Sequence, residues 1–271
     1  MSKKSINSHI QITNLLMKNF NNSNGLVAYY DFKKDEIKEE SSKKIGVKKG
    51  YYNEIVENFL NDEVENKVRN DIANIVKFAN GELKELIIKD VSNLKKFIEY
   101  SIIRSENYIK KIINKLNKNN LELLNDYSNR DFHNIYIYFY DTIKNNTFED
   151  LYMNILVNKS KTDFITLSNT IYQLDFQNYE HSLIFPLSPR VSIILSKRNN
   201  LLDLDKHHSS KKVKMYEMNQ KEIFNDKLVE EMNRQAVIGE IFTSNKFIIG
   251  NKNQLQTLKE YKKYIDKLLN G

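Results

Sequence analysis

The chain has 271 residues, a formal net charge of +7, 40% hydrophobic residues and no cysteine. The absence of cysteine excludes disulfide bonds, thiolate catalysis and Cys-ligated zinc or iron–sulfur clusters. No secretory signal opens the sequence and no run of about 18 apolar residues is present, so we expect a cytoplasmic protein without a membrane partner. The excess of positive charge fits nucleic acid or an acidic protein as a partner.

The N-terminal half predicts a hairpin and then two long helices. A short apolar run with a return strand predicts the hairpin, and apolar residues at helical spacing predict the helices. Only Asn80-Gly81 separates the two helices, and so short a break predicts that they pack as an antiparallel pair. The expected elements are strands at 26–30 and 37–40 and helices at 53–79 and 83–116.

In the C-terminal half the apolar pattern changes to a period of two, which predicts strands. We expect Tyr152–Val157 and Asp163–Asn169 to form a hairpin, and 247–249 to form a short edge strand. The tract Ile135–Tyr140 alternates like a strand but also fits a helix, and we favour the helix. The remaining expected elements are strands at 182–185, 191–196 and 212–218 and helices at 225–242 and 255–268.

This order of elements predicts an α+β fold: an N-terminal hairpin, a long antiparallel helix pair, and then a mostly antiparallel sheet with C-terminal helices. We expect one domain over residues 1–271, with a helical insertion at about 53–145 and a sheet-rich part at about 151–250. Both prolines lie in Pro186-Leu187-Ser188-Pro189. Because proline restricts φ and lacks an N–H donor, this pair predicts a rigid corner between two strands.

A series of short motifs, in this order, resembles the domain-of-unknown-function 4238 family of bacterial proteins. The motifs are His9 to Phe20, Tyr29-Tyr30-Asp31, Phe97-Ile98 with Arg104-Ser105, Phe164 to Asn169, Pro186–Pro189 and a helix around Asn233–Ala236. This sequence departs from the family pattern in three places. The segment after His9 is one residue longer and lacks a proline, Asn169 replaces an aspartate, and Thr170-Ile171 replaces a proline. The resemblance implies an architecture and a shortlist of residues rather than a reaction.

Three residues are candidates for catalysis: His9, Ser168 and Asn169. His9 has the chemistry of a general base or a metal ligand, and the alternative is that it packs and hydrogen-bonds to the backbone. Ser168 is a nucleophile only with a base beside it, such as His181. The alternative is that Ser168 and Asn169 hydrogen-bond to the backbone of a turn. We favour the structural alternative for all three residues.

The other histidines carry weaker signals. His133 follows Asp131, and we expect both at the solvated start of a helix, because neighbours at this spacing do not share a helix face. His207-His208, with Asp203 and Asp205, has ligand types that suit a divalent metal. No second ligand set is visible, so we expect a surface loop there. No metal site is therefore predicted, and the sequence names no cofactor.

A basic segment between residues 197 and 214 is the best candidate for contact with nucleic acid. Tyr216 follows it closely, and Asp203 and Asp205 only partly offset its positive charge. An ordinary solvated connection is the alternative, and a core stripe is likewise the alternative to base stacking for the tyrosines of Tyr136–Tyr140. The cations are Lys197, Arg198, Lys206, Lys211, Lys212 and Lys214.

Two functions compete, and the sequence leaves open whether the protein is an enzyme. The first is a cytoplasmic bacterial effector of a defence or toxin type that acts on nucleic acid as a nuclease, with His9 as its acid–base residue. It predicts that His9→Ala removes activity without changing the melting temperature. The second is a non-enzymatic protein that inhibits or recruits a nucleic-acid-handling partner. It predicts that neutralising Lys211 and Lys212 weakens binding and its salt dependence.

Overall fold

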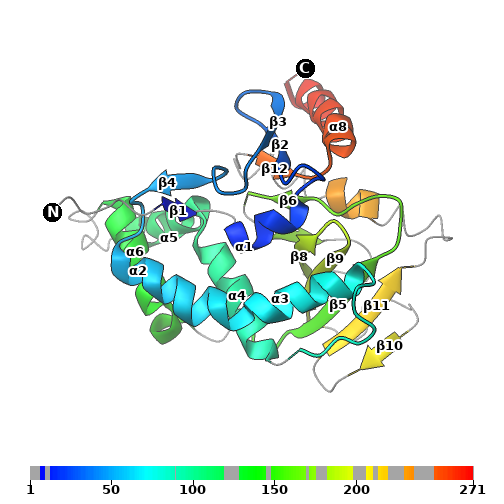
Figure 1. The fold of residues 1–271 in the computed structure, drawn as a ribbon. Helices are drawn as coiled ribbons and strands as arrows, with labels where there is room; N and C mark the ends of the chain where they lie inside the picture. The colour runs from blue at the N-terminus through cyan, green and yellow to red at the C-terminus, as the bar shows by residue number, and fades with distance from the viewer. Residues whose placement is uncertain are drawn as a thin grey trace.

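A computed structural model shows how these elements assemble (Figure 1). It describes residues 7–9, 13–88, 90–118, 128–144, 148–168, 171–174, 182–197, 206–209, 213–218, 229–234 and 247–270. Over these residues the chain is an α+β protein with antiparallel sheets, as the sequence predicts. Within the same residues, no helix has the length and apolar character needed to cross a membrane.

The N-terminal hairpin is confirmed and forms part of a four-stranded sheet. β2 (Val27–Asp31) pairs antiparallel with β3 (Glu36–Glu40), and the sheet order is β3-β2-β12-β6. The predicted edge position of residues 247–249 is wrong. β12 (Phe247–Ile249) lies between β2 and β6 (Thr166–Leu167), and all three of its residues are buried. A run of three apolar residues therefore fits an inner strand that is covered on both faces.

The first long helix is confirmed, whereas the second is wrong in extent. α2 (Glu54–Phe59), a π-helical turn η2 (Leu60–Glu65) and α3 (Asn66–Ala79) follow one another without a break. The second helix begins only with α4 (Val91–Ile103), because the Asp90 side chain caps it by accepting from the Ser92 N–H at 2.8 Å. It breaks at Arg104 and resumes as α5 (Glu106–Lys118).

The helical region is built around these two long helices. α4 contacts both α3 and η2, as expected for neighbouring helices of the predicted pair. The ambiguous aromatic tract is helical, within α6 (Asn129–Ile143), whose N-terminus is capped by Ser128. α6 contacts α2 and α5. Ile137 and Tyr140 are buried, while Tyr138 and Phe139 are exposed, so the aromatic stripe is core on one side only.

A six-stranded sheet forms the C-terminal part and has the order β10-β11-β5-β9-β8-β7. All its neighbours pair antiparallel except β11 and β5, which are parallel. The strands are β5 (Tyr152–Asn158), β7 (Tyr172–Leu174), β8 (Ser182–Ser188), β9 (Val191–Ser196), β10 (Lys206–Ser209) and β11 (Val213–Met218).

The predicted hairpin between 152–157 and 163–169 is wrong. β9 and β11 occupy both edges of β5, and the chain after Asn158 crosses to β6 in the four-stranded sheet. The Asn158 side chain sets this turn: its amide donates to the Thr162 carbonyl at 2.7 Å, and its carbonyl oxygen accepts from the Ser160 N–H at 2.9 Å. An asparagine that binds the backbone in this way directs the chain out of the sheet.

The proline stretch, predicted as a rigid corner between two strands, forms the hairpin that joins β8 and β9. Pro186 lies within β8, where the pairing with β9 is shifted by a bulge, and Pro189 with Arg190 forms the turn. Proline has no N–H to donate, so it is tolerated at a bulge and a turn. The second strand of this hairpin, β9, is buried along its whole length.

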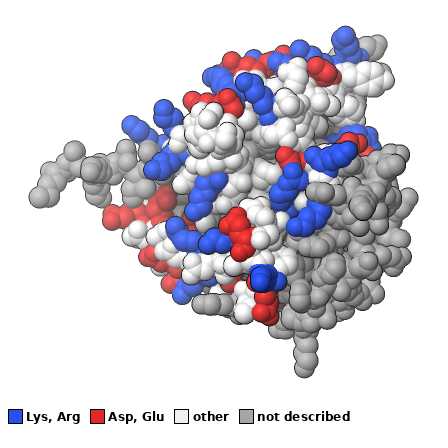
Figure 2. Space-filling model, turned by 45° about the vertical axis from the view of Figure 1, so that its right-hand side comes forward, with Lys and Arg blue, Asp and Glu red and all other residues white. Residues whose placement is uncertain are grey.

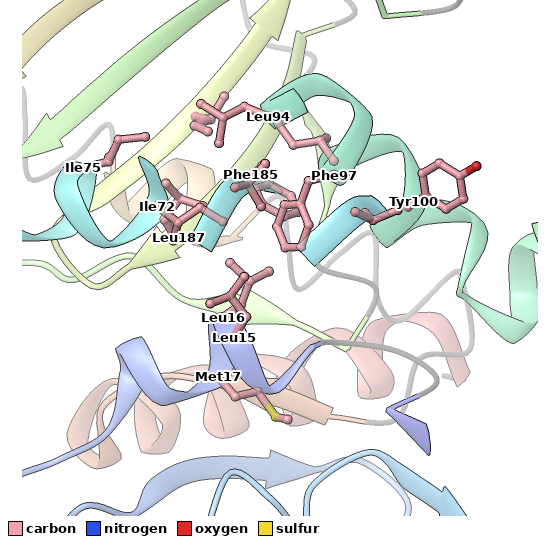
Figure 3. Packing of buried hydrophobic residues seen from close by; sticks show 14 of the residues in the cluster. Leu15, Leu16, Met17, Ile72, Ile75, Leu94, Phe97, Tyr100, Phe185 and Leu187 are labelled. Carbon is pink, nitrogen blue, oxygen red and sulfur yellow. The ribbon is translucent and has the colours of Figure 1, made fainter. Parts of the chain in front are cut away.

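Two apolar clusters lie on opposite faces of the sheets. Met153 and Ile155 of β5 enter the first cluster, whereas Leu156 enters the second, as the period of two requires. The first cluster also takes in α3, α4 and the short helix α1 (Asn14–Met17), which η1 (Lys18–Phe20) extends. Figure 3 shows side chains of α1 pointing toward those of α4 and β8.

The C-terminal helix is confirmed as α8 (Lys252–Asn270), which contacts β2 and β3. Of the predicted helix at 225–242, the described residues 229–234 are helical, and the rest lies outside the described residues. Leu255 and Leu258 of α8 enter the second apolar cluster together with Val229 and Met232. The C-terminal helix α8 therefore packs against the N-terminal hairpin. The subdivision of the single predicted domain stays a prediction.

Candidate functional site

Two of the predicted catalytic residues, His9 and Ser168, belong to different sheets. His9 ends β1 (Asn7–His9), which pairs with β4 (Val47–Lys49), while Ser168 directly follows β6 of the four-stranded sheet. Ser168 is fully buried, and its backbone N–H donates to the Phe247 carbonyl at 3.0 Å. Asn169 and His181 lie outside the described residues. The catalytic roles of His9, Ser168 and Asn169 stay predictions, and the burial of Ser168 favours the structural alternative.

The basic segment follows one edge and one end of the six-stranded sheet. Lys206 lies in edge strand β10 and Lys214 in β11, and Lys197 is exposed just after β9. Met153 pairs with both Leu195 and Val213, so the end of β9 and the start of β11 lie at the same end of the sheet. Arg198, Lys211 and Lys212 lie outside the described residues, and so do Asp203 and Asp205.

A second basic surface, which the sequence analysis did not single out, lies on the pair of strands β1 and β4. Residues 41–53 contain four lysines and no acidic residue, and all four lysines are exposed or half-buried at the surface. Lys43, Lys44 and Lys49 make no ion pair with any described acidic residue. We call β1, β4 and the lysines of this segment the basic ribbon; the lysines are Lys43, Lys44, Lys48 and Lys49.

Register and glycine geometry shape the basic ribbon. His9 is opposite Val47 and Ser8 is opposite Lys48, so the predicted acid–base residue occupies a position among lysines. Gly46 and Gly50 flank β4 with φ of +65° and +58°, a left-handed conformation that glycine adopts without strain. The chain therefore bends sharply at both ends of β4. The signal that could have found this surface is the absence of acidic residues over 41–53.

Tyr51 anchors the basic ribbon to α6. The Arg130 Nε donates to the Tyr51 carbonyl at 2.8 Å, and the Lys48 ammonium lies 5.2 Å from the centre of the Tyr51 ring. The Tyr51 hydroxyl lies 2.9 Å from Nδ1 of His133. These contacts with α6 hold the end of β4, and with it the lysines of the basic ribbon, in a defined position.

The expectation that His133 is solvated at a helix start is wrong. His133 is fully buried, and its Nε2 lies 2.8 Å from the Ile103 carbonyl. A carbonyl accepts only, so Nε2 carries the hydrogen, and Nδ1 of the neutral ring accepts from the Tyr51 hydroxyl. His133 lies one helical turn beyond Asn129 and faces the break between α4 and α5. This break is far away in sequence, so the spacing of residues within α6 does not reveal the contact.

Arg104, from the family-like Arg104-Ser105 motif, closes the same break. It is buried, and its guanidinium pairs with the Glu65 carboxylate at 2.8 Å. Its carbonyl accepts from the Tyr52 hydroxyl at 3.3 Å. Glu65 ends the π-helical turn η2, which therefore brings a carboxylate to a buried cation. The buried ion pair thus gives Arg104 of the motif a structural role, because it joins the end of α4 to η2.

Several other family-like motifs meet around Asp163. The Pro189 carbonyl accepts from the Phe164 N–H at 3.0 Å, and Arg190 pairs with the Asp163 carboxylate at 3.1 Å. The Asn233 side chain donates to the Asp163 carbonyl at 2.8 Å and accepts from the Ile165 N–H at 3.2 Å. Asp163 thus joins the β8–β9 turn to a helical segment that lies 70 residues further along the chain.

No group of three or more His, Asp or Glu residues that could hold a metal ion occurs within the residues that the structure describes. His207 and His208 lie in edge strand β10, not in a loop, and their side chains are outside the description.

The comparisons with known proteins found no match among curated proteins or among solved structures. One family model, described as "Protein of unknown function (DUF4238)", matches residues 12–254, which is most of the chain. The motifs from Tyr29 to Asn233 lie inside this range, and His9 lies just before it. The resemblance seen in the sequence is confirmed, and the chain belongs to the DUF4238 family.

Proposed function

We propose that this protein is a cytoplasmic effector that binds nucleic acid through the basic ribbon. The observation that carries the proposal is a stretch of surface lysines without acidic neighbours in sequence, on a two-stranded unit anchored to a helix. On the face drawn in Figure 2, basic and acidic side chains lie near one another over much of the described surface. A group of surface lysines attracts a phosphate backbone and releases its counterions on binding.

The aromatic residue beside these lysines supports the same function. Nucleic-acid surfaces combine cations that follow the backbone with aromatic rings on which bases stack. Tyr51 is partly exposed and lies next to Lys48. A two-stranded ribbon is also narrow enough to enter a major groove. The predicted segment at 197–214 adds a second basic edge, on the six-stranded sheet, and stays part of the proposal.

A binding series with a matched control tests the proposal. Labelled single- and double-stranded RNA and DNA are titrated with the full chain and with Lys48→Ala/Lys49→Ala over a range of salt concentrations. The slope of log affinity against log salt should fall by about 0.7 to 0.9 for each phosphate that the variant no longer neutralises. The control is Lys110→Ala/Lys111→Ala, which removes the same charge from exposed positions on α5. Equal effects of the two double variants would show that only net charge matters.

Phosphodiester cleavage is the finer form of the proposal, with His9 as the acid–base residue on the basic ribbon. His9→Ala should then abolish cleavage, with and without Mg²⁺ or Mn²⁺, while binding and melting temperature stay unchanged. Cleavage by the His9→Ala variant at the rate of the unaltered protein would remove this role.

A non-enzymatic protein that recruits or inhibits a nucleic-acid-handling partner is the second candidate. The burial of Ser168 and the amide at Asn169, where the resembling family pattern has an aspartate, favour it. Salt-dependent binding without cleavage under all metal conditions would support this candidate over the nuclease.

A further inference from the structure

A pocket of about 440 Å³ lies between the helical segment 229–234 and the N-terminal half of α8. Figure 1 shows α8 at the C-terminal end of the chain. The loop 161–163 forms its third side. The pocket shares no residue with the basic ribbon or with the basic segment at 197–214. Its volume falls within the range of about 300 to 1,000 Å³ that is typical of small-molecule sites.

The pocket floor is held in place by hydrogen bonds to Asp163. The Asp163 carbonyl accepts from the side-chain amides of Asn233 at 2.8 Å and of Gln254 at 2.6 Å. The Asp163 carboxylate accepts from Asn251 at 2.8 Å. Each amide nitrogen of Asn233 and Gln254 carries two hydrogens, and the bond to Asp163 uses one of them. The floor is therefore preorganised and retains donor capacity.

The walls combine a flat cation with apolar and aromatic surface. Leu258 and Tyr261 lie three residues apart on α8 and so share one of its faces. The Arg234 guanidinium is tied to Glu231 by two hydrogen bonds of 2.7 and 2.5 Å, and its remaining nitrogen donates to the Tyr261 hydroxyl at 3.3 Å. The bond with Glu231, followed by that with Tyr261, raises the pKa of Arg234. A guanidinium fixed in this way offers a planar face beside an aromatic ring.

The rim supplies groups with different hydrogen-bonding properties. Asn253 is exposed, and its amide both donates and accepts. Glu230 contributes a carboxylate acceptor, and Lys161 contributes an exposed ammonium at the mouth. A planar ring with donors and acceptors on its edge and a phosphate attached to it matches this set. An aliphatic amino acid would lack the planar surface that Tyr261 and Arg234 accommodate, and an aromatic one would lack the phosphate.

We infer that this pocket binds a nucleoside monophosphate unit, with the base against Tyr261 and Arg234 and the phosphate toward Lys161. Stacking on aromatic and guanidinium surfaces tolerates any base, and edge contacts with Asn253 and Glu230 would discriminate among bases. The same unit occurs as a free nucleotide and as the terminal nucleotide of a strand. The inference rests on the pocket alone and does not depend on the basic ribbon.

Calorimetric titration of the full chain tests the inference with AMP, GMP, CMP, UMP, ribose 5-phosphate and inorganic phosphate. At least one nucleotide should bind about tenfold more tightly than ribose 5-phosphate, because stacking adds to the interaction of the phosphate. Tyr261→Ala should remove this advantage. Tyr264→Ala, which changes an exposed tyrosine of the same helix outside the pocket lining, should retain it.

Further arms separate the alternatives. A 5′-phosphorylated trinucleotide that binds more tightly than the best mononucleotide identifies a strand end as the ligand, whereas weaker binding identifies the free nucleotide. Asn253→Ala changes an exposed residue and should alter the preference among bases even if Tyr261→Ala does not fold. No advantage of nucleotides over ribose 5-phosphate, or tighter binding of an amino acid, overturns the inference. Lys48→Ala/Lys49→Ala should leave nucleotide binding unchanged, so failure here is separate from failure of the basic ribbon.

Discussion

Asp163 at the pocket floor and Lys49 on the basic ribbon are both charged residues of short segments, but they meet different surroundings. The carbonyl and the carboxylate of Asp163 accept hydrogen bonds from side-chain amides, and the carboxylate also forms an ion pair with Arg190. Lys49 is exposed and makes no ion pair with a described acidic residue. The first residue is surrounded by partners from several segments, whereas the second has a free charge.

This difference separates stability from binding. Removing one partner of a buried hydrogen bond leaves the other without water or protein to replace it, so the fold loses free energy. Removing an exposed, unpaired charge costs the fold almost nothing. Substitutions around Asp163 should therefore act on unfolding, and those on the basic ribbon should act on binding. Four predictions test this division.

The largest expected effect comes from a buried polar residue beneath the basic ribbon itself. His133→Ala removes the donor to the Ile103 carbonyl and the acceptor for the Tyr51 hydroxyl, and it leaves a cavity. We expect a loss of about 3 to 5 kcal/mol in the free energy of unfolding, measured by urea denaturation. Tyr51→Phe should cost about 0.5 to 1.5 kcal/mol. Strictly additive effects in the double variant would show that the two side chains do not interact.

Asn233→Ala should have the next largest effect. It deprives the buried Ile165 N–H of its acceptor and the Asp163 carbonyl of one donor. We expect the free energy of unfolding to fall by about 2 to 3 kcal/mol. Asn253→Ala is the matched control, because Asn253 is an exposed asparagine of the same pocket. If Asn253→Ala lost as much free energy of unfolding as Asn233→Ala, the buried hydrogen bonds of Asn233 would not be the cause of the destabilisation.

Asp141 gives an intermediate case, because its side chain is partly exposed. Burial raises the pKa of Asp141, but hydrogen bonds from Lys96 at 2.6 Å and Lys144 at 3.1 Å outweigh burial and hold the pKa below 3.8. A lowered pKa contributes stability that is present above pH 3.8 and is lost as the pH falls through the folded-state value.

Denaturation curves recorded from about pH 5 downward should therefore show a smaller loss of stability for Asp141→Asn than for the unaltered protein. Tyr138, which is exposed on the same helix and carries no carboxylate, provides a control position. Parallel curves for Asp141→Asn and the unaltered protein would assign acid sensitivity to other carboxylates.

The smallest expected effect on stability is that of Lys48→Ala/Lys49→Ala. Both lysines lie at the surface, so the free energy of unfolding should change by less than about 0.5 kcal/mol. The same variant should give the reduced salt slope described for the basic ribbon. A large loss of stability would show that the cation–aromatic contact of Lys48 with Tyr51 supports the fold, and the division between the two regions would fail.

The sequence by itself determined the elements whose signal is local. The apolar runs of β2, β5 and β9 and the helical period in α3 and α8 identify those strands and helices, since their apolar side chains must be buried. The ordered motifs identified the family. Pro186 and Pro189 marked the β8–β9 hairpin, and Asn80-Gly81 marked the end of α3, because the backbone preferences of proline and glycine do not depend on distant residues.

Only the tertiary structure decided which strands pair and which polar residues are buried. An apolar strand can pair with any other apolar strand, so the sequence pattern assigned β5 to the wrong hairpin. For the same reason the inner strand β12 was predicted to lie at an edge of the sheet. His133 and Asp163 owe their surroundings to segments that lie far away along the chain, such as Ile103 and Asn233. Such hydrogen bonds depend on which distant segments the fold brings together, and the local pattern of apolar residues does not contain that information.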